Sequence, residues 1–333
     1  MSNLPMDSAR ARLGLHRGEL VEVRSAEEIL ASLGPDRSLD GLPFMPEMLK
    51  YCGRRFRVLA RAHKTCDTVN KTGGRRLHDA VHLDTLRCDG AAHGGCQAAC
   101  LLFFKEAWLK RVVDASPVGP VGAPPEQALR ALEPASSRVE PDGERSYRCQ
   151  ATELPRFTTP LSPWDWRQYL EDLWSRNVGL LEFLRVMAIA LYNQIQMLRG
   201  GRGFPSVRSL AEGRTASGSI GLKVGETVRV RSKEEIELTL KNGRNRGLWF
   251  DAEMVPYCGR TARIQARVER IIDERSGRMI ELPNDCFVLE DVYCRANFSR
   301  GRLLCPRRIV SYYREVWLER TDEEPARHDA TTA

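Results

Sequence analysis

The sequence lacks the short motifs that identify many nucleotide-binding and hydrolytic enzymes. It contains no phosphate-binding loop, no GxGxxG after a predicted strand, no GxSxG and no HExxH. It also offers no set of serine, histidine and aspartate with the spacing of a catalytic triad. No enzyme class can therefore be assigned by motif.

Long hydrophobic runs are also missing. The first fifteen residues, MSNLPMDSARARLGL, hold no apolar core of the kind that secretion signals carry. The most apolar window, 178–195, includes the charged residues Glu182 and Arg185 and two amide side chains, so it is a poor membrane span. We therefore expect a soluble, cytoplasmic protein without a transmembrane segment.

No run of five basic residues occurs, although the formal net charge is +7. A positive charge of this size is compatible with a polyanionic partner. Without a basic cluster the sequence does not favour nucleic acid, and a nucleic-acid-binding tandem barrel is kept only as an alternative.

Cysteine, in contrast, is abundant, with ten residues in 333, yet the CxxC spacing of common zinc sites is absent. Disulfides are disfavoured in a reducing compartment, so ten thiols favour metal binding or thiol chemistry. The competing interpretation is that they are small buried hydrophobic residues. Their positions in the chain help to decide between the two.

An internal repeat relates the two ends of the chain. YCGR occurs at 51–54 and 257–260, and nine of fourteen residues are identical between GLPFMPEMLKYCGR and GLWFDAEMVPYCGR, which end at those motifs. Downstream, KEAWLKR corresponds to REVWLER. The sequence predicts a tandem duplication with units at 15–113 and 222–322.

Each unit is predicted to be rich in β-strands. ELVEVRS and ETVRVRS alternate apolar and polar residues, as half-buried strands do. Ser25 with Glu28, and Ser232 with Glu235, have the capping-box spacing that opens a helix. We further expect a closing helix in each unit, over 96–111 and 306–320.

The predicted fold class is therefore α+β, with two tandem β-rich units that each end in a helix and are similar in pattern to SH3-like barrels. Residues 114–161 are predicted to be a linker rich in proline, alanine and glycine, which carries Cys149. Residues 162–200 are predicted to be a helical segment that packs the units together or binds a protein partner or a second copy; an interfacial membrane helix is an alternative. Residues 323–333 are predicted to be a disordered tail.

Three cysteines recur in register between the units. They pair Cys52 with Cys258, Cys88 with Cys294, and Cys96 with Cys305, and 36 residues separate the first two cysteines in both copies. Retention of three thiols favours metal ligation. The second unit has a fourth cysteine, Cys286, which can join a common site only if its strand bends, because an extended strand would separate it from Cys294 by about 26 Å.

The first unit is richer in potential ligands. RCDGAAHGGCQAAC, at 87–100, holds Cys88, His93, Cys96 and Cys100, and two adjacent glycines let the segment fold back on itself. Cys66 lies in the same unit. His82 stands near the position of Cys286 in the other copy and is an alternative fourth ligand. His63 and His78 are expected on the surface, and Cys149 is either an outside ligand or a buried thiol.

The leading hypothesis is a metal–thiolate protein with a binding, scaffold or accessory role in a biosynthetic pathway. Its cofactor is an iron–sulfur cluster or zinc, a choice that the spacing leaves open. The alternative from another class is an enzyme that uses an iron–sulfur cluster, or a cysteine activated by His93, in the first unit. The predicted metal ligands are Cys52, Cys66, Cys88, His93, Cys96, Cys100, Cys258, Cys286, Cys294 and Cys305.

Overall fold

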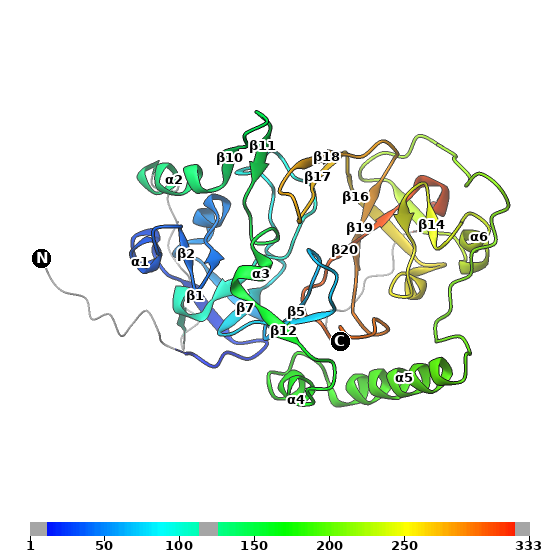
Figure 1. Cartoon of the computed structure of the whole chain (residues 1–333), viewed down its shortest axis with the longest axis horizontal. Coiled ribbons are helices and arrows are strands. Elements are labelled where there is room, and N and C mark those ends of the chain that lie inside the picture. Colours follow the sequence, from blue (N-terminus) through cyan, green and yellow to red (C-terminus); the bar gives the residue numbers. More distant parts are fainter. Residues whose placement is uncertain (1–11, 113–125, 324–333) are drawn as a thin grey trace, which may run out of the picture. The chain divides into compact units, whose positions relative to one another are not determined.

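The computed structural model describes residues 12–112 and 126–323, which form a strand-rich α+β protein with several small sheets and few helices (Figure 1). The chain divides into two compact units. The first comprises Met1–Val178, Ile272–Ile280 and Cys305–Arg307. The second comprises Gly179–Ile271, Glu281–Leu304 and Arg308–Ala333. Short segments from late in the sequence therefore belong to the first unit.

The first unit is built on a five-stranded antiparallel sheet with the strand order β8-β7-β4-β1-β9. Val21 and Val23 of β1 are fully buried, while their neighbours are partly exposed, as the alternating sequence predicts. The strands are β1 (Leu20–Val23), β4 (Arg55–Arg61), β7 (Ala80–Leu83), β8 (Phe104–Lys105) and β9 (Leu109–Arg111).

The second unit contains a five-stranded sheet of the same design, with the order β20-β19-β16-β13-β21. The irregularity in strand pairing also recurs, between Val58 and Ala60 in one sheet and between Ile264 and Ala266 in the other. The strands are β13 (Thr227–Val230), β16 (Thr261–Arg267), β19 (Phe287–Tyr293), β20 (Val310–Tyr313) and β21 (Leu318–Arg320).

Both predicted capping boxes are confirmed. The hydroxyl of Ser25 accepts the backbone N–H of Glu28, whose carboxylate accepts the N–H of Ser25, at the start of α1 (Ala26–Ser32). Ser232 and Glu235 exchange the same two bonds at α6 (Lys233–Glu237). Two donors that would be unsatisfied at each helix start are thereby bonded.

The predicted closing helices are wrong. Over 96–111 the chain forms a loop, then β8, the 3₁₀ turn η3 (Glu106–Trp108) and β9; over 306–320 it forms β20, η6 (Glu315–Trp317) and β21. The two strands of each segment pair with opposite edges of the sheet, and most of their apolar residues are buried in a pattern that resembles a helical period. Tertiary strand pairing therefore overrides the local helix preference.

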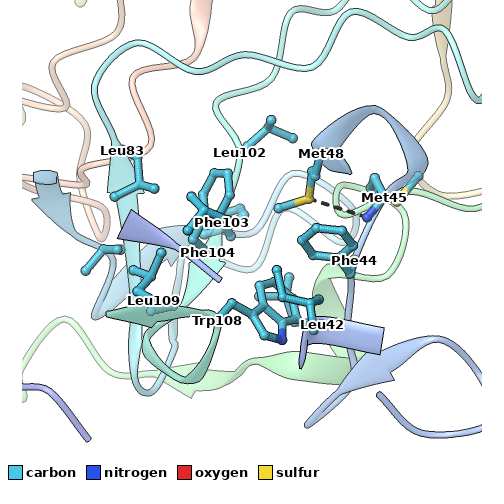
Figure 2. Packing of buried hydrophobic residues seen from close by; sticks show 14 of the residues in the cluster. Leu42, Phe44, Met45, Met48, Leu83, Leu102, Phe103, Phe104, Trp108 and Leu109 are labelled. Carbon is cyan, nitrogen blue, oxygen red and sulfur yellow. Dashed lines mark hydrogen bonds between the residues drawn. The ribbon is translucent and has the colours of Figure 1, made fainter. Parts of the chain in front are cut away.

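A tryptophan anchors the core of each unit. Trp108 and Phe44 are both buried and meet edge to face, with ring centroids 5.1 Å apart. Figure 2 shows these two rings among Leu42, Met48 and their neighbours. In the second unit Trp317 and Phe250 meet in the same way at 5.3 Å. Such pairs stabilise by about 1 kcal/mol beyond the apolar area that they bury.

The predicted linker is ordered over much of its length, which corrects the sequence prediction. Apolar side chains of this segment are buried in the first unit's core, among them Ala128, Leu132, Ala151, Leu154 and Phe157. Its elements are α2 (Glu126–Leu132), η4 (Glu133–Ala135), β10 (Ser137–Val139), β11 (Arg145–Tyr147), α3 (Leu154–Phe157) and β12 (Thr159–Leu161). The rest of the predicted linker, 114–125, and 324–333 of the predicted tail lie outside the described residues.

The predicted helical segment contains two helices, α4 (Arg167–Trp174) and α5 (Leu180–Leu198). Among the described residues no helix combines the length and apolar character needed to cross a membrane. The remaining short elements are β2 (Ser38–Leu39), β3 (Leu42–Pro43), η2 (Pro46–Tyr51), β5 (Lys64–Cys66), β6 (Gly74–Arg76), β14 (Arg244–Asn245), β15 (Leu248–Trp249), η5 (Val255–Tyr257), β17 (Arg270–Ile272) and β18 (Met279–Glu281).

Candidate metal centre

The cysteine- and histidine-rich segment 87–100 forms a closed loop between β7 and β8. Its ends are joined by a hydrogen bond from the backbone N–H of Cys88 to the carbonyl of Cys100, 2.8 Å long. The loop turns at Gly90, which has φ 72° and where a Cβ would overlap the backbone of Cys96. The N–H of His93 then donates to the carbonyl of Gly90 at 3.0 Å. This turn brings His93 back towards Cys88.

Three different ligand types meet at this loop. The Sγ of Cys88 lies 3.3 Å from Nε2 of His93 and 3.4 Å from Oε1 of Glu47, a residue of η2. Nδ1 of His93 lies 3.6 Å from the same carboxylate oxygen. One donor atom from each residue lies within 4.8 Å of the other two. A thiol, an imidazole and a carboxylate at this separation can bind one ion together.

Two polar atoms of this group are buried without a hydrogen-bond partner among the described residues. The side chains of Glu47 and His93 each expose only 2% of their surface. Neither Oε2 of Glu47 nor Nδ1 of His93 has a hydrogen-bond partner there. The 3.6 Å separation of Nδ1 from Oε1 of Glu47 is too long for a hydrogen bond. Each such orphan costs about 1–3 kcal/mol, a penalty that ligation would remove.

More thiols line the same pocket. Its cavity measures about 30 Å³, which is room for one ion or water molecule. Besides the three donors, its walls contain Cys96, Cys100 and Cys149. The sequence left Cys149 undecided between an outside ligand and a buried thiol, and the structure places it at this pocket in the core of the first unit.

The environment opposes an uncompensated thiolate. Burial raises the pKa of Cys149 to about 12 and that of Cys100 to about 11. The pKa of Cys88 is raised strongly by burial and then by the charges of Glu47, Cys100 and Cys149. A nucleophilic cysteine needs the opposite shift, so the arrangement does not favour the activated-cysteine interpretation. A metal cation would supply the missing positive charge.

Three predicted ligands, Cys66, Cys100 and Cys305, interact with the charge of a buried arginine. Arg307 is 2% exposed and donates to the hydroxyl of Thr68 at 2.8 Å, and it pairs with Glu274 at 3.4 Å. Burial opposes its charge, but Glu274 and the thiols of Cys66, Cys100 and Cys305 raise its pKa overall. All three thiols are thus near this guanidinium, which disfavours a cation between them.

The second unit does not bring its four predicted ligands together. Within the described residues, no three donors from Cys258, Cys286, Cys294 and Cys305 lie at ligand distance, and Cys305 belongs to the first unit. Burial raises the pKa values of Cys258 and Cys286 to about 11. In the first unit, Cys52 likewise lies in the apolar core, and burial raises its pKa to about 11.

The glutamates that correspond in the two copies have different surroundings. Glu253 aligns with Glu47, yet both of its oxygens are bonded: it accepts the backbone N–H groups of Asn297 and Phe298 and the hydroxyl of Ser299, at 3.0, 2.7 and 2.8 Å. Glu253 therefore fixes a loop, whereas Glu47 faces a thiol and an imidazole. Glu47 was not among the predicted ligands, although the same glutamate in both repeated sequence segments was a visible signal.

The histidine predictions have mixed outcomes. His63 is buried rather than exposed, with Nε2 3.1 Å from the carbonyl of Gln168 and 3.3 Å from Asp172. Burial, followed by the charge of Lys64, lowers its pKa to about 3, so it is neutral. Nδ1 of His82 contacts the carbonyl of Leu102 at 2.8 Å, away from the three-ligand group.

Comparison with known proteins adds no name to this site. No protein-family model matches the sequence, and no curated protein shows significant similarity to it. The function must therefore be inferred from the geometry of the site.

Proposed function

We propose that this protein is a metal–thiolate protein whose first unit binds a single transition-metal ion through Cys88, His93 and Glu47. The observation that carries the proposal is the convergence of three donors within 4.8 Å, two of which have buried atoms without hydrogen-bond partners. An ion bound by Oε2 of Glu47 would satisfy that oxygen, and His93 would bind the ion through one of its two ring nitrogens. It would also compensate the charge of a Cys88 thiolate.

Zinc fits this donor set best. Zinc accepts sulfur, imidazole nitrogen and carboxylate oxygen, and it needs a fourth ligand. Cys149 lines the pocket and interacts electrostatically with Cys88, so its thiol could complete the tetrahedron. A fourth protein ligand gives a closed, structural site, while an open position would hold water.

The second unit supports different roles for the two units. We infer that the two sheets, with their equivalent strand order, capping boxes and aromatic pairs, arose by duplication of an SH3-like unit. In the second copy Glu253 binds a loop instead of facing a thiol. The first unit then carries the metal chemistry, and the protein acts as a cytoplasmic binding or accessory protein, as its sequence predicts.

An iron–sulfur cluster is the second candidate, because four thiols line one pocket: Cys88, Cys96, Cys100 and Cys149. Cys149 is electrostatically coupled to Cys100 and Cys96, and Cys88 is coupled to Cys100 and Cys149. No three of these sulfur atoms form a ligand group within 4.8 Å. Four thiolates around a single zinc would lie about 4 Å apart, given Zn–S bonds of about 2.3 Å, so more widely spaced thiolates would suit a cluster. A cluster would need the pocket to widen, because its cavity of about 30 Å³ has room for one ion.

Metal analysis and the visible spectrum of the full chain, purified without oxygen, distinguish these candidates. One zinc per chain and no visible absorbance support the zinc site. Iron with acid-labile sulfide and a broad brown absorbance support the cluster. A chain that binds no stoichiometric metal, even after reconstitution with zinc or with iron and sulfide, contradicts both.

Variants then identify the ligands. Cys88→Ser and His93→Ala should each lose the zinc, whereas Cys96→Ala should retain it and would lose a cluster. Cys52→Ala is the matched control, because its thiol is buried in the same unit but belongs to the apolar core. Loss of metal from Cys52→Ala alone would contradict the assignment.

A further inference from the structure

Helix α5 (Leu180–Leu198) carries an exposed apolar stripe whose spacing is that of a coiled coil. Six side chains recur at alternating intervals of three and four residues: Leu181, Leu184, Ala188, Leu191, Ile195 and Leu198. All six are exposed, and Leu181 and Leu198 expose 84% and 76% of their surface. This 3.5-residue period places them on one side of the helix, as the a and d positions of heptads.

The opposite side of α5 packs within its own unit. Val186 is fully buried there, and the carboxylate of Glu182 accepts the side-chain N–H of Asn297 at 2.7 Å. Asn193 exchanges two hydrogen bonds with the backbone of Phe204, at 2.6 and 2.8 Å. At about 100° per residue, this anchored side lies roughly opposite the stripe. The stripe is therefore not needed to attach the helix to its unit.

The exposed area matches what a dimer needs. Soluble proteins rarely expose an apolar patch of this extent on a regular helix without a partner. With Leu180 and Tyr192 at its margins, the stripe has seven large apolar side chains, and at roughly 100 Å² each they present close to the 800 Å² per partner of a standard interface. The stripe is regular over the whole of α5, which Figure 1 shows as one continuous helix.

We propose that α5 pairs with α5 of a second copy of this chain, in a parallel two-stranded coiled coil. Leucine at all three d positions and Ile195 at an a position favour two strands. A heptad stripe is complementary to itself, so a second copy fits without any further partner. The pairing is separate from the metal site and does not depend on it.

The flanking positions bring no like charges together in the parallel orientation. Arg185 and Arg199 both fall at e positions. In a parallel pair the e positions face g positions, where Leu180, Met187 and Gln194 carry no charge.

The test uses the full chain and measures its mass in solution by light scattering over a dilution series. Wild type should have twice the chain's 37.7 kDa at high concentration and should dissociate on dilution. Leu184→Glu and Leu184→Lys should each be monomeric, because position 184 faces itself in the parallel pair. Their equimolar mixture should regain the dimer, which also shows that both variants are folded.

Leu238→Glu is the matched control, because this leucine is exposed to 63% but lies outside α5, and it should leave the dimer intact. A wild type that stays monomeric at every concentration overturns the proposal. So does a dimer that persists in both Leu184 variants, or a mixture that stays monomeric. A wild type that is monomeric and co-floats with anionic phospholipid vesicles would show that the stripe covers a lipid surface instead.

Discussion

The aligned glutamates Glu47 and Glu253 should respond in opposite ways to the same substitution. Glu253→Gln replaces one carboxylate oxygen by an NH₂ group that faces backbone N–H donors. The variant loses at least one charge-assisted bond and leaves a buried donor unsatisfied, which together cost about 3 kcal/mol of unfolding free energy. Glu47→Gln removes no backbone bond, and it exchanges a buried oxygen that has no hydrogen-bond partner for a neutral amide nitrogen at the same place.

The unfolding free energy of Glu47→Gln should therefore stay within about 1 kcal/mol of wild type when metal is removed with a chelator. Urea denaturation followed by circular dichroism measures both variants under the same conditions. Metal content supplies the second measurement, and here the order reverses: Glu47→Gln should lose zinc affinity while Glu253→Gln retains it. Equal destabilisation by both substitutions, with equal retention of metal, would refute the different roles that we assign to the two residues.

Three further predictions concern the fold and the loop. Trp317→Phe should lower the unfolding free energy by about 1 kcal/mol more than Trp108→Phe does. The indole N–H of Trp317 donates to a threonine hydroxyl at 2.8 Å, whereas that of Trp108 has no partner in the described chain. Equal losses in urea denaturation would contradict this. Burial raises the pKa of Glu315, but hydrogen bonds from two backbone N–H groups and a serine outweigh it and lower the pKa overall. The stabilisation of the folded state by ionised Glu315 is therefore complete above about pH 4.3 and is lost as the pH falls through the lower folded-state pKa. In Glu315→Gln the unfolding free energy from urea titrations should fall less steeply with decreasing pH than in wild type. Gly90→Ala should abolish metal binding and destabilise the first unit by about 1–3 kcal/mol, since the residue has φ 72° and no space for a Cβ. A stable variant that still binds metal would show that the loop geometry is wrong.

The local features of the fold were predictable where the sequence determines them locally. The alternation in β1 and β13 and the two capping boxes depend on neighbouring residues, and the structure confirms them. The closing segments could not be predicted, because their strand form depends on pairing with β1, β7, β13 and β19, which are distant in sequence. The same holds for the predicted linker, where α3 is buried through contacts that composition does not reveal.

The candidate site was predictable in part. The density of Cys88, His93, Cys96 and Cys100 marked the right loop, but the turn that returns His93 to Cys88 is at Gly90 and not at the two adjacent glycines. Glu47 comes from η2, forty-one residues earlier, so only the folded chain shows that it meets Cys88. The recurring thiols were a less reliable guide, because a cysteine retained in both copies can be a core residue, as Cys52 is.

X-ray absorption spectroscopy of the metal bound to the full chain tests the central proposal most directly. For zinc held by Cys88, His93 and Glu47, we predict mixed coordination, with sulfur at about 2.3 Å, nitrogen or oxygen at about 2.0–2.2 Å, and the scattering pattern of one imidazole. The imidazole signal should be absent from any metal retained by His93→Ala. A shell of four sulfur atoms without imidazole would contradict the account.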